Sequence, residues 1–349
     1  MTSQVGSKRV TLAQVAEQAG VSVMTASYTY NRPSRVSDQM RTRVLAAAAH
    51  LGYAGPDPSA RSLRRGSTRT LGVVFGEHLS YAFEDPGATA FLAGVAEVCT
   101  DHGYGMTILP VTGGKDDVPR ITDAAVDGFI VWNTFDDDPV LAAVQARNRP
   151  AVIHSGPTVS GLELVTIDNR SAARAVGAHA FAGATRPAIM STPVSPQRVS
   201  TSTTGAGIAD VEFSIVRARL QGYRRAAEKA GFDWSDVAVA VCNRNDATEA
   251  EHLATRLLTS PDPPDAIAAM TDEQAAGVIR AARAIGLLIP DDLAVTGWDD
   301  AAVAEPLGLT TVAQSLRDQG AACAHAALGQ QFARHTTSWR VIRRGSTRR

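Results

Sequence analysis

The chain has 349 residues, of which 44% are hydrophobic and 20% are charged, so it is long enough to bury the cores of two or three domains. No apolar run approaches the roughly 18 residues of a membrane span, and the polar N-terminus lacks the apolar stretch of a secretory signal peptide. Three scattered cysteines without a C-x-x-C spacing argue against a disulfide framework and against a zinc site. These features predict a cytoplasmic protein.

The charge is unevenly distributed along the chain. Residues 1–69 carry ten Lys/Arg against three Asp/Glu, whereas the remaining residues carry 24 against 32. A basic head on a mildly acidic body indicates an anionic partner for the head only. Because a basic segment can also serve solubility alone, charge leaves both interpretations open.

Two short helices joined by a tight turn are predicted in VTLAQVAEQAGVSVMTASYTYN, residues 10–31. Thr11 can cap a helix over 12–19, and Gly20 permits the turn that follows. Ser22 can then cap a second helix over 23–31. Two helices that meet at such a turn are typical of a helix-turn-helix, whose second helix reads DNA in the major groove.

The second helix should turn one face to DNA and the other to a small core. At 100° per residue, one arc of about 140° holds the side chains of Val23, Met24, Ser27, Tyr28 and Asn31. Tyr30 falls outside this arc and should pack in the core. Val23 and Met24 can contact thymine methyl groups, and the Tyr28 hydroxyl can hydrogen-bond to a base edge. Contact with the DNA backbone only is the alternative for Tyr28.

A third helix and a possible fourth follow. The third is predicted over 38–51, with the inward positions occupied by Val44, Leu45, Ala48 and Leu51. In GPDPSARSLRRGST (55–68), Asp57 can cap and Pro58 can begin a helix that Gly66 ends. About eight residues are too few for a helix that stands alone in water, so this one would need a partner. A plain linker is the alternative.

From residue 70 onward, short apolar strands alternate with alanine-rich helices. Strands are predicted at 70–76, 104–111, 126–133, 150–156, 164–169, 186–192, 237–243, 265–272 and 293–300. Helices are predicted at 88–102, 171–183, 217–231, 246–259, 273–286 and 317–332. This alternation predicts doubly wound parallel sheets that bind ligands at the carboxyl ends of their strands. The Ser/Thr/Pro/Gly-rich stretch 191–207 is expected to be a mobile surface loop.

Three N-terminal segments together resemble one family of regulators. VTLAQVAEQAGVSVMTAS, NRPSRVSDQMRTRVLAAAAHLGY and PSARSLRRGST are similar to the headpiece and hinge of the lactose-repressor/galactose-repressor (LacI/GalR) family of transcriptional regulators. Farther along, VDGFIV, RLQGY, TDEQAAG and GWDD stand where the same family has recurrent motifs in its periplasmic-binding-protein-like core. The resemblance spans 10–65 in the head and nearly all of 70–341 in the body.

The resemblance implies an α/β fold with an N-terminal helix-turn-helix headpiece, a hinge helix and a two-subdomain core of doubly wound parallel sheets. The headpiece is expected over 8–56, the hinge helix and linker over 57–69, and the core over 70–341. Its two subdomains are expected at about 70–180 plus 317–332, and at 181–316 plus 333–341.

The family also implies a homodimer on a near-palindromic operator of double-stranded DNA. Its headpieces would enter major grooves, while its hinge helices would pair in the minor groove and wedge Leu63 into the central base step. The implied DNA-binding residues are Thr11, Ser22, Val23, Met24, Thr25, Ser27, Tyr28, Asn31, Ser37, Ala60, Arg61 and Leu63. The chain has SYTYN where the family usually has SRVLN, and an extra residue precedes Ala60. Because the common contact of an arginine with guanine is unavailable at Tyr28, more specificity should come from apolar contacts, the hinge and DNA deformability.

A small-molecule effector is implied in the cleft of the core. Arg219 of RLQGY and Asp299 of GWDD match family positions that bind ligand hydroxyls, and arginine donates where aspartate accepts. The expected effector-binding residues are Ser80, Tyr81, Phe83, Asp85, Phe91, Arg219, Thr271, Trp298 and Asp299. Trp298 or Phe91 could stack on a ring, so a sugar or other polyol fits this set best. A surface salt bridge is the alternative for Arg219, and a turn cap for Asp299.

An enzyme is not expected, because phosphate-binding and dinucleotide-binding glycine motifs and the G-x-S-x-G elbow are all missing. The eight histidines lack metal-ligand spacing, so neither a metal nor a cofactor nor a catalytic residue is predicted. A solute-binding protein of the periplasmic type is the alternative that the body alone permits, but the basic head argues against it. The sequence therefore predicts a ligand-responsive transcriptional regulator, by resemblance a repressor.

Overall fold

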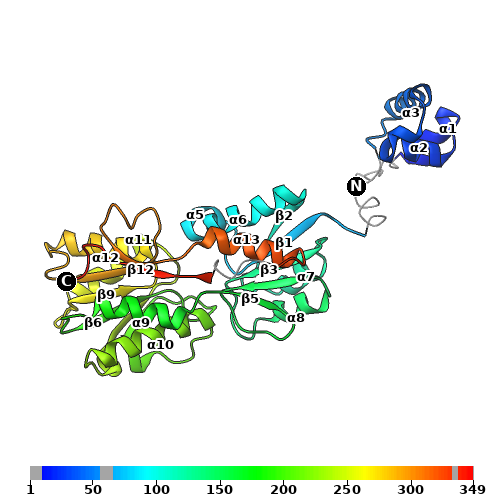
Figure 1. The fold of residues 1–349 in the computed structure, drawn as a ribbon. Helices are drawn as coiled ribbons and strands as arrows, with labels where there is room; N and C mark the ends of the chain where they lie inside the picture. The colour runs from blue at the N-terminus through cyan, green and yellow to red at the C-terminus, as the bar shows by residue number, and fades with distance from the viewer. Residues whose placement is uncertain (1–9, 56–65, 332–336, 349) are drawn as a thin grey trace, which may run out of the picture. The chain divides into compact units, whose positions relative to one another are not determined.

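The computed structural model describes residues 10–55, 66–331 and 337–348. The chain divides into two compact units, which we call the headpiece (residues 1–68) and the body (residues 69–349). Figure 1 shows the headpiece as a small cluster of helices and the body as two α/β lobes, the two subdomains.

Over residues 10–55, the headpiece has three α-helices, α1 (Leu12–Ala19), α2 (Val23–Asn31) and α3 (Asp38–Leu51), and the 3-10 turn η1 (Pro33–Arg35). Its three helices confirm the predicted spans. Thr11 caps α1 in a reciprocal pair of hydrogen bonds with Gln14, a capping box. Gly20 ends this helix at φ 61°, in the left-handed region that favours glycine, and this sharp stop turns the chain into α2.

Small apolar residues fill the headpiece core. The buried members are Val15, Ala16, Ala19, Ala26, Val44, Ala47 and Ala48. Tyr30 packs against them as predicted, with its ring 6.0 Å from that of Tyr53. The inward orientation expected for Leu45 is wrong, because Ala47 occupies the core side of α3 and Leu45 is 41% exposed.

The first subdomain of the body is a parallel sheet between two helical layers. Its strands are ordered β2-β1-β3-β4-β5. They are β1 (Thr70–Phe75), β2 (Gly105–Pro110), β3 (Gly128–Trp132), β4 (Ala151–His154) and β5 (Glu163–Val165). The helices α6 (Pro86–His102) and α13 (Leu316–Ala327) pack on one face of the sheet (Figure 1). The short helix α5 (Tyr81–Glu84) comes directly before α6 in the chain. On the other face lie α7 (Asp117–Thr122) and α8 (Pro139–Ala146).

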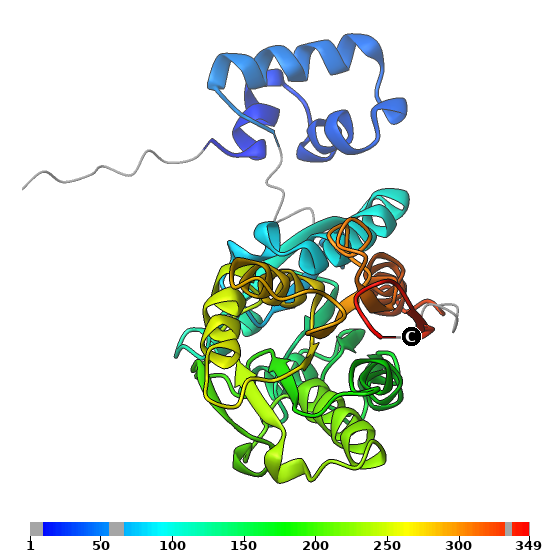
Figure 2. The ribbon, with the colours of Figure 1, turned by 90° about the vertical axis from the view of Figure 1, so that its left-hand side faces the viewer.

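The second subdomain is a larger sheet with the order β12-β11-β10-β9-β6-β8-β7. Its strands are β6 (Pro187–Ser191), β7 (Thr201–Thr204), β8 (Ala238–Val241), β9 (Ala266–Ala269), β10 (Ala294–Asp299), β11 (Thr310–Ala313) and β12 (Arg340–Ile342). Two helix pairs cover opposite faces, as Figure 2 shows. They are α9 (Asn169–Ala180) with α10 (Ser214–Lys229), and α11 (Ala247–Leu258) with α12 (Asp272–Ala284); η2 (Gly205–Gly207) and η3 (Trp234–Asp236) complete the lobe.

Three strands, β7, β11 and β12, are additions to the predicted set. β7 lies inside the stretch expected to be a mobile loop and pairs antiparallel with β8, so that expectation is wrong for 201–204. β12 pairs antiparallel with β11 at the opposite edge. Edge strands of three or four residues carry little apolar pattern of their own, because backbone pairing defines them.

The boundary expected near residue 180 is also wrong. Helix α9, placed in the first subdomain by the prediction, packs against α10 and contributes to the core beneath the second sheet. The second subdomain also reaches beyond residue 341, because Ser346 and Thr347 are buried against β10 and β11. An amphipathic helix reveals which face it buries, but its sequence does not reveal which sheet it covers.

Candidate functional site

The exposed face of α2 carries the residues expected to read DNA. Val23 and Met24 are 51% and 63% exposed, although both are large apolar side chains, while Ala26 and Thr29 of the same helix are buried. Tyr28 is half-buried on this helix and takes no part in the core cluster. The structure thus presents an apolar surface of α2 that the other described headpiece residues leave exposed.

Three further residues expected at the DNA are the N-caps of the headpiece helices. The hydroxyls of Thr11, Ser22 and Ser37 accept hydrogen bonds from the first turns of α1, α2 and α3. A helix N-terminus carries free amide groups and a partial positive charge, which suits phosphate. Thr25 Oγ1 lies 2.9 Å from Ser22 Oγ, and Asn31 Nδ2 donates to Ser27 Oγ over 3.2 Å. Ala60, Arg61 and Leu63 lie outside the described residues.

A cavity of about 520 Å³, the main cavity, lies between the two subdomains. One wall follows the carboxyl end of β1 and runs through α5 to the start of α6. The other wall comes from the second subdomain. The lining includes Glu77, His78, Ser80, Tyr81, Glu84, Asp85, Arg198, Asn243, Arg244, Asn245, Asp246, Glu273 and Arg280. Three of the expected effector residues, Ser80, Tyr81 and Asp85, are thus brought together.

Polar contacts cross from one wall of the cleft to the other. Asn245 Nδ2 donates to Asp85 Oδ2 over 2.5 Å, and Arg198 Nη2 donates to Glu77 Oε1 over 2.7 Å. Arg217 also donates to Asp136 over 2.5 Å. These three bonds join the two subdomains, and the first two do so in the wall of the main cavity. Sequence reasoning missed Arg198, because a lone arginine in a Ser/Thr-rich stretch gives no signal of its partner.

Asp299 lines a neighbouring cavity of about 340 Å³, which shares Pro86, Asn245 and Glu273 with the main cavity. Gln314 Nε2 donates to Asp299 Oδ1 over 2.7 Å. Burial raises the pKa of the Asp299 carboxyl, and the positive charge of Arg219 opposes that shift. Thr271 lines the same cavity, but its hydroxyl already donates to Asn245 over 2.6 Å and caps α12.

Arg219 is buried rather than exposed on its helix, so a surface salt bridge is excluded. Its Nε donates to Asn169 Oδ1 over 3.0 Å, and its Nη1 donates to the Met270 carbonyl over 2.8 Å. The guanidinium lies 3.9 Å from the ring centre of Trp298, a cation–π contact. Burial lowers the pKa of Arg219, while the charge of Asp299 acts in the opposite direction. The charges of Arg219 and Asp299 are therefore coupled, although Asp299 lines the smaller cavity and Arg219 lines neither of the two.

Two sequence families match this architecture. The family described as "Bacterial regulatory proteins, lacI family" matches residues 11–55, and "Periplasmic binding protein-like domain" matches residues 204–347. The HTH-type transcriptional regulator Rv3575c of Mycobacterium tuberculosis is 34% identical over 318 residues, 90% of this chain and 89% of that protein. The chain belongs to the LacI family of bacterial regulatory proteins. This confirms the resemblance and the predicted fold class, and it makes the chain a DNA-binding transcriptional regulator.

Solved structures agree with this assignment of the LacI-family regulator. A LacI-family transcriptional regulator from Corynebacterium glutamicum is 28% identical, with a TM-score of 0.70 over 98% of this chain and 99% of that chain. The CelR–cellobiose complex shares the fold at 24% identity and a TM-score of 0.64, over 97% of this chain and 100% of that chain. Because the relatives are regulators that match across the headpiece, the alternative of a periplasmic solute-binding protein is set aside.

In this LacI-family regulator, three of the four aromatic residues expected around the effector, Phe83, Phe91 and Trp298, lie outside the two cavities, whereas Tyr81 lines the main one. Phe83 is 70% exposed and outside the cavity linings, and Phe91 is fully buried with its ring stacked 5.0 Å from Trp132. Trp298 is fully buried as well, and its ring face is occupied by Arg219. The expected stacking of Phe91 or Trp298 on a ligand ring is therefore wrong for this conformation. Both side chains are packed in the protein core, so neither has a ring face free for a ligand.

The described part of this regulator holds no group of His, Cys, Asp and Glu that could bind a metal ion. Its three cysteines are free and buried. Among residues 10–55, 66–331 and 337–348, none of the helices has the length and apolar character that a membrane span requires.

Proposed function

We propose that this LacI-family regulator binds a near-palindromic operator as a homodimeric repressor and that a sugar-like polyol in the body cavities controls its affinity for DNA. The observation that carries the proposal is the cleft itself. The main cavity is lined from both subdomains, and Asp299, whose charge is coupled to that of the buried Arg219, lines the cavity next to it. A ligand there contacts both lobes, so its binding depends on how the lobes are arranged.

The class of effector follows from the lining. Carboxylates, amides and arginines make up most of the described lining of the main cavity, and Tyr81 and His78 supply the aromatic rings found among those residues. Such walls offer hydrogen bonds to a molecule rich in hydroxyl groups and little to an apolar one. The CelR structure, which shares this fold, was solved with cellobiose. A sugar or other polyol is therefore the effector class that we infer.

Control of DNA binding requires that the effector prefers one arrangement of the lobes. The bonds Asp85–Asn245 and Glu77–Arg198 stabilise the observed arrangement of the lobes. A polyol that replaces or reinforces these bonds shifts the balance by its differential affinity for the two arrangements. Fluorescence anisotropy tests this control: affinity for a selected operator is measured with and without each compound of a sugar and polyol library.

Sedimentation tests the homodimer, and a monomer bound to one half-site would contradict it.

Asp299→Ala should weaken binding of a polyol effector by about 1–3 kcal/mol, because effector hydroxyls and Gln314 lose their acceptor. DNA affinity without effector should stay nearly unchanged, since the substitution lies in the body. Thermal shift with the same library, on wild type and variant, measures the effect. Asp137→Ala, which removes an exposed carboxylate of the body, is the matched control. Compounds that stabilise wild type and Asp299→Ala equally would contradict the role of this residue.

Tyr28→Arg should move the preferred half-site toward guanine at one position, by about 1–3 kcal/mol for a bidentate pair. The reason is that Tyr28 lies on the same helix as the exposed Val23 and Met24. Selection of binding sites from random DNA measures the preference. Tyr28→Phe, which removes only the hydroxyl, should not create a guanine preference. An unchanged preference in Tyr28→Arg would show that this position faces away from the base edges.

A further inference from the structure

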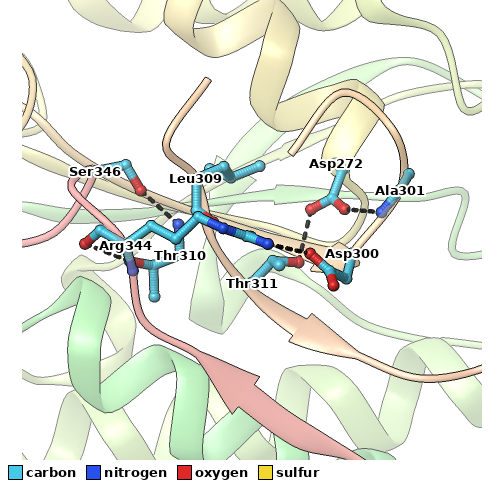
Figure 3. A network of polar contacts seen from close by, with 8 residues as sticks. All are labelled: Asp272, Asp300, Ala301, Leu309, Thr310, Thr311, Arg344 and Ser346. Atoms are coloured by element: carbon cyan, nitrogen blue, oxygen red, sulfur yellow. Dashed lines mark hydrogen bonds and ion pairs between the residues drawn. The ribbon is translucent and has the colours of Figure 1, made fainter. Parts of the chain in front are cut away.

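Residues 343–348 are built into the second subdomain. After β12, Ser346 Oγ accepts a hydrogen bond from the Thr310 amide over 2.8 Å (Figure 3). The same hydroxyl donates to the Val295 carbonyl over 2.6 Å. Thr347 is buried too, with its hydroxyl 3.0 Å from that of Thr310. We call residues 343–348 the C-terminal strap. It is anchored on β10 and β11, the strands that flank the Asp299 turn.

Arg344 is the strap residue that reaches this turn. Its Nη2 donates to Asp300 Oδ1 over 2.7 Å, and its Nη1 donates to the Leu309 carbonyl over 2.8 Å (Figure 3). Both side chains of the ion pair are mostly buried, with 20% and 27% exposure. A guanidinium that bonds to two fixed acceptors is far less free to move than one in an exposed pair.

The turn needs such support because its backbone is strained. Asp299 and Asp300 have φ values of 100° and 53°, a region that residues with a side chain rarely adopt. Strain of this kind persists only where the surrounding structure imposes it. Asp272 supplies one constraint: its Oδ2 accepts from the Ala301 amide over 2.7 Å, while its Oδ1 accepts from Thr311 (Figure 3).

The charges at the turn are a second reason why it needs support. Three carboxyl groups, those of Asp272, Asp299 and Asp300, gather at this turn. Burial and the negative charge of Asp299 raise the pKa of Asp272 to about 8. Arg344 is the cation that pairs with the turn directly, whereas Arg219 is bonded to Asn169 and Met270.

We propose that Arg344 is a positioning residue for effector binding: its bond to Asp300 holds the turn in the conformation that presents the Asp299 carboxylate to the cavity. The proposal rests on the proposed function, in which Asp299 accepts from effector hydroxyls. Without Arg344, the turn relaxes toward ordinary φ values and Asp299 leaves its position, although the cavity walls remain. The C-terminal strap is thereby part of the effector site, without lining it.

Hydrogen exchange of the full-length protein tests the positioning without any ligand. Exchange of the Ala301 amide should be at least about tenfold faster in Arg344→Ala, because the turn that holds this amide against Asp272 opens more often. Arg344→Lys, which keeps the charge near Asp300, should restore part of the protection. The matched control is Ser346→Ala, which removes another anchor of the strap but no contact to the turn. It should leave exchange at Ala301 as in the wild type.

Affinity for cellobiose, measured by calorimetry on the same proteins, provides the second readout. Arg344→Ala should weaken cellobiose binding about tenfold, whereas Ser346→Ala should not, even if both lower the melting temperature. Unchanged exchange at Ala301 in Arg344→Ala would overturn the proposal, and so would equal loss of affinity in both variants. If wild type does not bind cellobiose, the proposed function fails for this probe while exchange still decides the role of Arg344. Should Arg344→Ala not fold, Asp300→Asn tests the same bond from its other end.

Discussion

Operator binding by the full-length regulator should weaken by about 10³–10⁵-fold when salt rises from about 50 to 200 mM, if the dimer makes six to ten phosphate contacts. The physical reason is the charge of the first 69 residues, with ten Lys/Arg against three Asp/Glu. Each phosphate that a basic side chain neutralises releases a condensed counterion, and the entropy of that release falls as salt rises. Fluorescence anisotropy on a selected operator, repeated over a salt series, measures the slope.

Two control proteins locate the effect in the headpiece. The body alone, residues 69–349, forms a compact unit and should not bind the operator at any salt concentration. Arg224→Ala removes an exposed cation whose partner is Glu228 of the same helix, and it should leave the slope unchanged. Operator binding by the isolated body, or a flat salt response of the whole protein, would contradict the role that we give to the headpiece.

The body should lose about 3 kcal/mol of its unfolding free energy between pH 7 and pH 4 through one buried histidine. Burial lowers the pKa of His154 from its ordinary 6.5 to about 4. The unfolded chain then binds this proton more tightly than the folded one. The contribution of neutral His154 to the free energy of unfolding is fully present above pH 6.5 and is lost as the pH falls through 4. Urea denaturation over a pH series measures the loss.

The surroundings of His154 explain the size of this effect. Its Nε2 lies 2.8 Å from Oε1 of Gln319, and its ring packs 4.5 Å from Phe91. Within the described residues Nδ1 has no hydrogen-bond partner, so no acceptor there would stabilise a second proton. His154→Gln should remove this part of the pH dependence while keeping a polar group beside Gln319. The matched control is His252→Gln, at the surface of the same body. Identical pH profiles of the two variants would contradict the prediction.

The headpiece is the part of this protein that local sequence determines most completely. Thr11 marks where α1 begins, Gly20 marks where it ends and Ser22 marks where α2 begins, since caps and left-handed turns depend on a few neighbouring residues. Helical periodicity likewise predicted that Tyr30 packs against the headpiece core. Leu45 shows the limit: helical periodicity alone does not decide whether a leucine or a nearby alanine, Ala47, faces the core.

The effector region is where tertiary structure decided what sequence motifs could only suggest. RLQGY and GWDD identified Arg219 and Asp299, but only packing shows that Trp298 holds the guanidinium rather than offering a face to a ligand. Ser80, Tyr81 and Asp85 reach the main cavity because strand β1 ends there, whereas Phe83, between them in sequence, points to solvent. Short-range patterns cannot state which way each side chain of a four-residue helix turns.

Contacts between distant segments were beyond sequence reasoning altogether. Arg198 meets Glu77 across the cleft, and Arg344 meets Asp300. Helix α9 joins the second subdomain although it follows directly after the first sheet. Local sequence determines capping, turns and periodicity, because these depend on residues within one or two turns of chain. Charge pairing, strand order and the choice of lobe depend on which segments the fold brings together, and only the tertiary structure contains that information.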